Sequence, residues 1–292
     1  QNGNVYWPEY NLNSIGSLTI GDGYQTKMNE FEYLVVSGNI VGYDNVINLN
    51  SGWSILGYLH QNTGDIINIF EPFVDNIIII KDENGNVYWP EYNLNSILNM
   101  DPGKGYQIKT SSNILFSYSD LMDGREYFVN KLQNTYFEQP HFTGNNMTIL
   151  FPIHTRNNLI DLHDEIAVYD KNGLLVGSSI VNDEHTVISV WGDDLTTLHK
   201  DGIAIGEELF FKLWDSNLNI EHNLIVNNWD KGSDAYNIDG ISVVGNIRIN
   251  TDKLIDKKLL KVFDVLGRET DKKGFILEMY NDGTMDKRSY IK

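Results

Sequence analysis

An acidic loop is the part of the chain whose residue types and spacing best suit a metal ion. Asp193, Asp194 and Asp201 fall close together, and the pair Glu207-Glu208 follows. Hard cations such as Ca²⁺ prefer several carboxylate and carbonyl oxygens, and a loop between strands can supply them. The spacing is not that of an EF-hand, and aspartates at strand ends also cap turns and keep strand edges soluble. The loop is therefore predicted to be either a calcium site or a solvated turn, and no cofactor is required.

A repeated aromatic cluster has the residue types that stack on sugar rings. Tyr88, Trp89 and Tyr92 lie in a Tyr-Trp-Pro-Glu-Tyr segment, and an identical segment spans residues 6–10. Exposed Trp and Tyr rings present an apolar face with a polar edge, and two displayed copies would add avidity for a polymer. The alternative, which we favour, is that these rings fill a small β core that the duplication has preserved.

The motifs of common enzyme classes are absent from the sequence. The seven histidines include no His-Glu-x-x-His pair, and no Gly-x-Ser-x-Gly elbow is present. The Gly-x-Gly segments at residues 21–23 and 103–105 precede predicted strands, so turn chemistry explains them better than a phosphate loop. The absence of cysteine excludes disulfides, thiolate zinc sites and a cysteine nucleophile. We therefore expect that this chain is not an enzyme.

The composition is that of a globular protein with a strongly acidic surface. The 292 residues, 41% of them hydrophobic, are enough for about two domains and a sizeable core. Forty acidic and 22 basic residues give a formal net charge of −18, which disfavours nucleic acid and anionic membrane surfaces as partners. No apolar run reaches the roughly 18 residues of a membrane-spanning helix, so membrane insertion is not expected.

A duplication organises the N-terminal part of the chain. Residues 2–15 recur unchanged as residues 84–97, and the pattern Gly-x-Gly-Tyr-Gln-x-Lys at 21–27 recurs at 103–109 with the same offset of 82 residues. Fourteen consecutive identities indicate a duplicated module. We expect residues 1–37 to be the C-terminal half of a truncated repeat and residues 38–119 to be a full repeat. The chain is accordingly expected to be part of a longer protein.

Hydrophobic patterning predicts an all-β protein: small β-rich repeat modules with a short helix, then a β-sandwich of about seven or more strands. Apolar residues at helical spacing predict a helix over residues 65–73, with Asp65 as its N-cap. Residues 120–139 are irregular and are expected to be a connector. Residues 140–250 form the sandwich, because short β-type runs alternate there with turns. Its predicted strands cover residues 147–151, 164–169, 174–181, 186–191, 208–214, 224–229 and 241–249.

The tail, residues 251–292, carries three motifs of a known family. They are Lys261-Val-Phe-Asp-Val-Leu-Gly-Arg268, Gly274 with Tyr280-Asn-Asp-Gly283, and the ending Lys287-Arg-Ser-Tyr-Ile-Lys292. Together they resemble the C-terminal sorting domain of substrates of the Bacteroidota type IX secretion system, although the Pro-Asn-Pro segment that usually opens the family is missing. The resemblance implies a short β-rich domain whose signal residues are Lys261, Asp264, Gly267, Arg268, Gly283, Lys287 and Lys292. It further implies export across the outer membrane and contact with the type IX machinery.

The sandwich region carries further segments with a counterpart in exported proteins. They include Asp164-Glu-Ile-Ala-Val-Tyr-Asp170, Val190-Trp-Gly-Asp-Asp194 and Asp239-Gly-Ile-Ser-Val243. They resemble a β-sandwich module that recurs in surface and secreted Bacteroidota proteins, and that module implies no particular enzymatic activity.

These observations lead to one expectation and one alternative. We expect the non-catalytic C-terminal region of a secreted or cell-surface protein, with repeat and sandwich as spacer or adhesion modules and the tail as sorting signal. The alternative is a carbohydrate- or calcium-binding accessory module of a larger secreted enzyme. The expected partners are the type IX secretion machinery and either a glycan or another surface protein.

Overall fold

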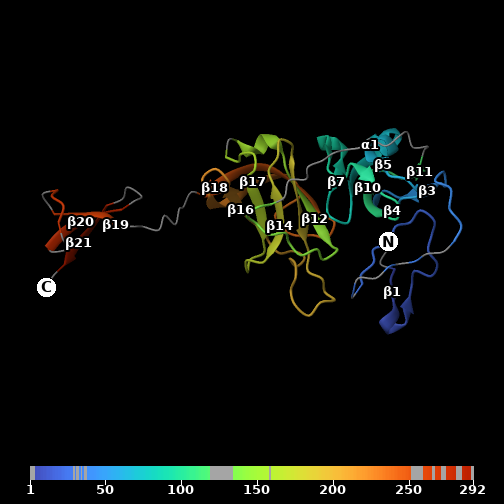
Figure 1. Ribbon diagram of the computed structural model, residues 1–292, viewed down its shortest axis with the longest axis horizontal. Helices are drawn as coiled ribbons and strands as arrows, with labels where there is room; N and C mark the ends of the chain where they lie inside the picture. The colour runs from blue at the N-terminus through green and yellow to red at the C-terminus, as the bar shows by residue number, and fades with distance from the viewer. Residues whose placement is uncertain are drawn as a thin grey trace. The chain divides into compact units, whose positions relative to one another are not determined.

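Most of the regular secondary structure of the protein is β-strand, which confirms the predicted all-β class. The computed structural model describes residues 4–28, 30, 33, 35, 38–118, 134–157, 159–250, 259–264, 267–270, 274–280 and 285–290. The chain divides into two compact units, residues 1–248 and residues 249–292 (Figure 1). The larger unit holds both copies of the repeat and the strands of the predicted sandwich. Residues 120–133 of the predicted connector lie outside the described residues.

The full repeat forms a five-stranded antiparallel sheet. Its strand order is β4 (Gly52–Gly57), β10 (Gly105–Thr110), β6 (Ile77–Lys81), β7 (Val87–Trp89) and β8 (Leu94–Asn95). Two smaller sheets accompany it, pairing β3 (Ile47–Leu49) with β11 (Ile114–Phe116) and β5 (Gly64–Asp65) with β9 (Asn99–Met100). Its single α-helix, α1 (Ile66–Phe70), buries Ile66, Ile69 and Phe70 in the core of this module.

The helix begins where the sequence predicts and ends earlier. The Asp65 carboxylate accepts hydrogen bonds from the backbone amides of Ile67 (2.8 Å) and Asn68 (3.4 Å), so Asp65 is the predicted N-cap. After Phe70 the chain continues as a 3-10 helix, η2 (Glu71–Asn76), instead of an α-helix up to residue 73. Pro72 accounts for the change, because proline restricts the residue before it and has no amide hydrogen to donate.

Seven strands make up the predicted sandwich, and all of them belong to one hydrogen-bonded sheet. They are β12 (Asn146–Phe151), β13 (Glu165–Tyr169), β14 (Leu175–Ile180), β15 (Thr186–Trp191), β16 (Phe210–Asp215), β17 (Ile220–Lys231) and β18 (Ile241–Asn250). Their order is β14-β13-β16-β17-β18-β12-β15. Strand β13 pairs antiparallel with β14 and β16, β16 with β17, and β12 with β15, whereas β12 and β18 run parallel.

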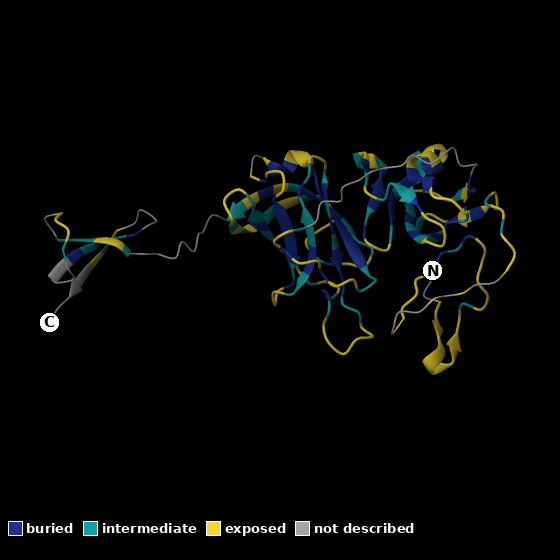
Figure 2. Cartoon of the chain, viewed as in Figure 1, coloured by how far each residue is buried: buried dark blue, intermediate teal, exposed yellow. Residues whose placement is uncertain are grey.

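The sheet curls over until its two edge strands lie side by side. A Cβ atom placed on Gly177 of β14 would come within 2.9 Å of the carbonyl oxygen of Ser189 on β15. The result is a closed, sandwich-like body in which one face of each strand points inward. Figure 2 shows the buried residues concentrated on these strands and the exposed residues in the connecting loops. Alternation along β15, where Thr186, Ile188 and Val190 are buried, reflects this geometry.

The full repeat and the sandwich share a hydrophobic core. Trp89 and Ile79 of the repeat pack in one buried cluster with Leu150 of β12 and Val243 of β18. Beside this cluster the Ser189 hydroxyl donates a 2.9 Å hydrogen bond to the Gly85 carbonyl, in the turn between β6 and β7. The two modules are therefore joined by packed side chains as well as by the covalent chain.

The smaller unit is a three-stranded antiparallel sheet. It consists of β19 (Leu259–Asp264), β20 (Gly274–Tyr280) and β21 (Met285–Tyr290), in that order. A β-rich tail was expected, and its described residues form the strands of this sheet. In the part of the chain that the structure describes, no helix is long and apolar enough to cross a membrane.

Candidate functional site

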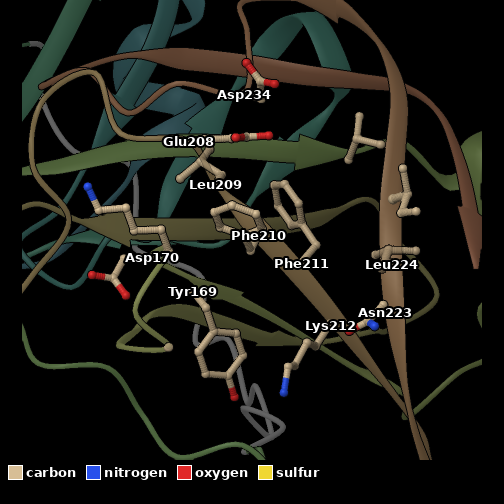
Figure 3. A pocket seen from close by; sticks show the side chains of 14 residues that line it. Tyr169, Asp170, Glu208, Leu209, Phe210, Phe211, Lys212, Asn223, Leu224 and Asp234 are labelled. Atoms are coloured by element: carbon tan, nitrogen blue, oxygen red, sulfur yellow. The ribbon is translucent and has the colours of Figure 1, made fainter. Parts of the chain in front are cut away.

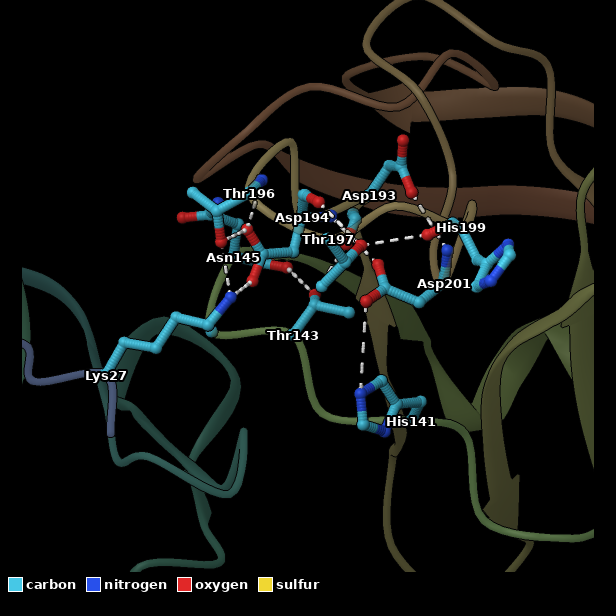
Figure 4. Close-up of polar contacts among 12 residues, drawn as sticks. Lys27, His141, Thr143, Asn145, Asp193, Asp194, Thr196, Thr197, His199 and Asp201 are labelled. Carbon is cyan, nitrogen blue, oxygen red and sulfur yellow. Dashed lines mark hydrogen bonds and ion pairs between the residues drawn. The ribbon is translucent and has the colours of Figure 1, made fainter. Parts of the chain in front are cut away.

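The acidic loop after β15 is closed by its own carboxylates. Asp201 Oδ1 accepts a 2.9 Å hydrogen bond from the Asp194 amide, and Asp193 Oδ1 accepts one of the same length from the Asp201 amide (Figure 4). This reciprocal pair fixes the two ends of the loop against each other. A carboxylate that already accepts backbone amide hydrogens at close range has less capacity for a cation.

The Asp194 side chain pairs with a lysine from the first repeat copy. Its carboxylate accepts from the Thr196 amide and hydroxyl, and it forms an ion pair with Lys27. The bond from Lys27 is the largest of the causes that lower the pKa of Asp194 to about 2. Among the residues that the structure describes, no three His, Asp or Glu side chains are grouped to hold a metal ion. Asp193, Asp194 and Asp201 thus close a loop and bind Lys27, which favours the turn over the calcium site among the two alternatives.

The second aromatic cluster lies in the core. Tyr88 and Trp89 are 6% and 0% exposed, and Tyr92 is half-buried with its ring edge-to-face against Trp89 at 4.9 Å. Tyr88 packs in the core of the repeat, and Trp89 packs where the repeat meets the sandwich. This corrects the ligand-stacking prediction for Tyr88 and Trp89, because a ring enclosed on all sides has no face for a sugar. The alternative interpretation, a core preserved by duplication, describes this copy.

The first aromatic cluster has the same local structure and a different environment. We call residues 5–14 the first hairpin and residues 87–96 the second hairpin. The first hairpin contains β1 (Tyr6–Trp7), the 3-10 turn η1 (Pro8–Tyr10) and β2 (Leu12–Asn13). In it Tyr6, Trp7 and Tyr10 are 65%, 42% and 66% exposed. Of the two repeated aromatic clusters, the first is therefore the exposed one.

The described surface of the sandwich has a shallow groove. It has a volume of about 570 Å³ and lies over β13, β16 and β17 (Figure 3). Two of its charged groups are paired. Lys212 Nζ lies 2.7 Å from Glu221 and 5.0 Å from the Tyr169 ring centre, and Asp170 accepts from Lys200 Nζ at 2.7 Å. Burial alone would raise the pKa of Asp170, but this bond and two backbone amides outweigh it and lower the pKa. The groove offers no protonated carboxyl for acid catalysis at Asp170.

A buried lysine at the boundary between repeat and sandwich was not predicted. Lys81, at the end of the isoleucine run of β6, is fully buried, and its Nζ lies 2.9 Å from Asn146 Oδ1 and 3.3 Å from Asp239 Oδ1. The ammonium also lies 4.7 Å from the centre of the Trp53 ring. Burial lowers the pKa of Lys81, against the opposing effect of Asp239. A charge that interrupts an apolar strand run is the sequence signal that could have identified this site.

A buried glutamate holds the segment that precedes the sandwich. Glu165, at the start of β13, is fully buried and accepts from the backbone amides of Tyr136 (3.0 Å) and Phe137 (2.8 Å). The Thr135 hydroxyl donates a further 2.9 Å bond to it. Like Lys81, Glu165 binds groups of the larger unit and so stabilises its fold.

Three of the residues predicted to form a sorting signal, Asp264, Gly267 and Arg268, lie in one turn of the tail. Asp264 Oδ1 accepts from the Arg268 amide (3.0 Å), and Asp264 Oδ2 accepts from Arg268 Nε (2.8 Å), while Gly267 has the positive φ of 78° that the turn requires. Lys261 pairs with Glu269 at 3.1 Å, and Lys287 lies on β21 opposite Leu277. The predicted signal residues Gly283 and Lys292 lie outside the described residues.

Comparisons with protein-family models, with curated proteins and with solved structures each find no match to this chain.

Proposed function

We propose that this chain is a non-catalytic region of a secreted or cell-surface protein. Residues 1–248 act as a rigid spacer or adhesion body, and the tail is an address for type IX secretion. The main support is that charged side chains of the core and the acidic loop bind groups within residues 1–248. Lys81, Glu165 and the Asp193–Asp201 pair all bind groups of the body itself, so the chemistry of the chain serves its assembly.

A spacer must transmit orientation from one end to the other, and the core between repeat and sandwich supports this role. A hinged pair of modules would present a polar boundary, whereas Trp89, Leu150 and Val243 form a buried cluster across it. Lys81 adds two polar bonds to the sandwich from within that apolar boundary. Separating the modules would expose this core and leave the buried charges without partners, which is costly.

The tail has the surface that a recognition signal needs. The Arg268 and Lys261 side chains are 72% and 51% exposed, although both are held by ion pairs. Residues 251–292 contain ten basic and eight acidic residues, whereas residues 1–250 contain 12 basic and 32 acidic ones. The tail is thus electrostatically distinct from the acidic body, as a segment read by separate machinery would be.

Two of the observations behind the accessory-module alternative no longer favour it. The acidic loop no longer supports calcium binding, and the second aromatic cluster no longer supports glycan stacking. Of the two repeated clusters, only the first has exposed rings that a sugar could stack on.

Export of the chain from a host with an active type IX system tests the proposal. The full chain is expected to reach the medium or cell surface, and the chain ending at residue 250 to stay inside. Arg268→Ala is expected to reduce export, because it removes the group that clamps the signal turn to Asp264. Leu260→Ala, an exposed substitution on the neighbouring strand, is the matched control. Equal export with and without the tail would contradict the proposed address.

A further inference from the structure

Lys81 meets an amide and a carboxylate at the boundary between the repeat and the sandwich. Its Nζ lies 2.9 Å from Asn146 Oδ1 and 3.3 Å from Asp239 Oδ1, and its side chain is fully buried. A further neighbour of the ammonium is the face of the Trp53 ring, whose centre is 4.7 Å from Nζ. An amine, a carboxamide and a carboxylate therefore meet at one site, and these are the groups that amide exchange requires.

The backbone holds the reacting side chains in place. Lys81 is the last residue of β6, which pairs with β10 on one side and β7 on the other. Asn146 is the first residue of β12 and pairs with Trp191 of β15. The Asp239 amide donates a 3.0 Å hydrogen bond to the Asn146 carbonyl, which keeps these two residues side by side. Three segments that are distant in sequence thus position the groups in advance.

The separation of the amine from the amide carbon suits a nucleophilic attack. The Cγ atom of Asn146 lies one bond of about 1.2 Å from Oδ1, so the 2.9 Å contact places Nζ at most about 4.1 Å from Cγ. Reacting atoms about 3–3.5 Å apart are in near-attack geometry, in which an internal reaction gains greatly over a bimolecular one. A shift of about 1 Å or less brings Lys81 to that range.

The surroundings favour the neutral, nucleophilic form of the lysine. Burial lowers the pKa of Lys81, Asp239 opposes this effect, and Lys109 adds to it. The Lys109 ammonium lies 5.3 Å from the centre of the same Trp53 ring. Desolvation beside another cation is a way in which proteins turn a lysine into a nucleophile. The Asp239 carboxylate is within reach of Nζ to accept the proton.

We propose that Lys81 and Asn146 form an intramolecular isopeptide bond, with Asp239 as the acid–base group. The free amine attacks Cγ of Asn146, so that a bond forms between Nζ and Cγ and the bond between Cγ and Nδ2 breaks. Nζ gives up two of its three protons, and Asp239 relays both to Nδ2. The leaving group departs as ammonium, Asp239 ends ionised as it began, and no oxidant or further reactant is needed.

The bond ties the repeat covalently to the sandwich. It joins residues 65 positions apart in sequence, on either side of the predicted connector, and such a cross-link constrains the unfolded chain. The reaction occurs once in each chain without turnover, so it is compatible with a non-catalytic region. This inference goes beyond the spacer and export roles and does not depend on them.

Mass spectrometry of the purified full chain under denaturing conditions tests the bond. The expected mass is lower than that of the sequence by one molecule of ammonia. Proteolytic digestion should then release a branched peptide that contains both Lys81 and Asn146. Cyclisation of Gln1 also releases ammonia, so the branched peptide, and not the mass alone, identifies the bond.

Three variants separate the roles of the groups. Lys81→Met removes the nucleophile and should abolish the branched peptide. Asp239→Asn keeps the size of the side chain and should slow bond formation about a hundredfold or more, measured as the unlinked fraction at successive times after synthesis. Lys212→Met, which removes a lysine paired with Glu221 on the sandwich, is the matched control and should form the bond as the unaltered chain does.

A folded chain without the branched peptide overturns the proposal, whatever its mass. A branched peptide that joins Lys81 to a residue other than Asn146 also overturns it. Bond formation at an unchanged rate in Asp239→Asn overturns the role of Asp239. Circular dichroism shows whether each variant is folded, and if Lys81→Met does not fold, the peptide from the unaltered chain decides.

Discussion

The two hairpins compare one sequence in two environments. Residues 2–15 and 84–97 are identical, and the hairpins within them fold alike, yet Trp7 is partly open to solvent and Trp89 is fully buried. The local structure is therefore dictated by the sequence of the hairpin, through its Pro-containing turn, its left-handed asparagine and its serine bonds. Burial is dictated by what lies beside it. The comparison separates the contribution of local sequence from that of tertiary contact at matched positions.

The largest effect is expected from removing the tryptophan of each hairpin in turn. Trp89→Ala deletes a fully buried ring and should lower the free energy of unfolding by about 3–5 kcal/mol. Trp7→Ala removes the same side chain from an exposed site and should change it by about 0.5 kcal/mol or less. Urea unfolding of both variants measures the difference. Equal destabilisation would mean that the first hairpin is also part of a core.

A second pair of matched positions is Gly23 and Gly105. A Cβ atom on Gly23 would lie 2.4 Å from Ile55 Cγ2, whereas one on Gly105 would meet its nearest neighbour at 3.6 Å. Gly23→Ala should therefore loosen the contact of the first copy with β4 at a cost of about 1–3 kcal/mol. Gly105→Ala should be neutral or stabilising by about 0.4–1 kcal/mol, because it restricts the unfolded chain.

Hydrogen exchange at the Gly23 and Gly57 amides reports on this contact directly, since both donate across it. Gly23→Ala should speed exchange at Gly57 without changing exchange in the seven-stranded sheet. Faster exchange throughout the chain would instead show that the contact supports the whole unit.

The elements of the fold could be predicted from sequence more fully than their environment. Strand Ile77–Lys81 and the Asp65 N-cap follow from apolar runs and capping chemistry, which act over a few residues. The closure of seven strands into one curled sheet depends on contacts such as Gly177 against Ser189, which no local pattern encodes. The exposure of Trp7 and the burial of Trp89 could not be distinguished at all, because their neighbouring residues are the same.

The alternatives left open for the candidate sites could not be separated for a related reason. Carboxylate spacing in the loop suits calcium, but it suits amide capping equally well, and the choice depends on where the Asp194 and Asp201 amides point. The buried charge of Lys81 was missed, because its partners Asn146 and Asp239 are distant in sequence. Sites built from distant segments need a fold before they can be recognised.

The lysines at matching motif positions, Lys27 and Lys109, should contribute differently to the stability of the protein at low pH. Lys27 is the main cause of the lowered pKa of Asp194, about 2 against an ordinary 3.8, whereas Lys109 lies 5.3 Å from the Trp53 ring centre. A lowered carboxyl pKa adds stability that is fully present above pH 3.8 and is lost as the pH falls through 2. Lys27→Met should remove most of it, about 1 kcal/mol after allowing for the exposure of Lys27.

Acid unfolding followed by circular dichroism measures this difference. The Lys27→Met variant should unfold at a higher pH than the unaltered chain, and Lys109→Met should keep the original acid midpoint. An NMR titration of the Asp194 carboxyl group should show its pKa rising toward 3.8 in Lys27→Met. An unchanged pKa there would show that the Thr196 bonds, and not Lys27, hold the carboxylate ionised.

The smallest expected effect concerns calcium at the loop that the first copy contacts. A ligand that binds the folded state at a hundred times its dissociation constant would stabilise it by about 2.7 kcal/mol, which thermal unfolding detects easily. We expect no shift on adding calcium or chelator, because Asp193 and Asp201 accept backbone amides and Asp194 pairs with Lys27. Lys27→Met sharpens the test by removing the competing cation. A calcium-dependent rise in that variant alone would show that Lys27 occupies a latent cation site, and a rise in the unaltered chain would restore the calcium hypothesis.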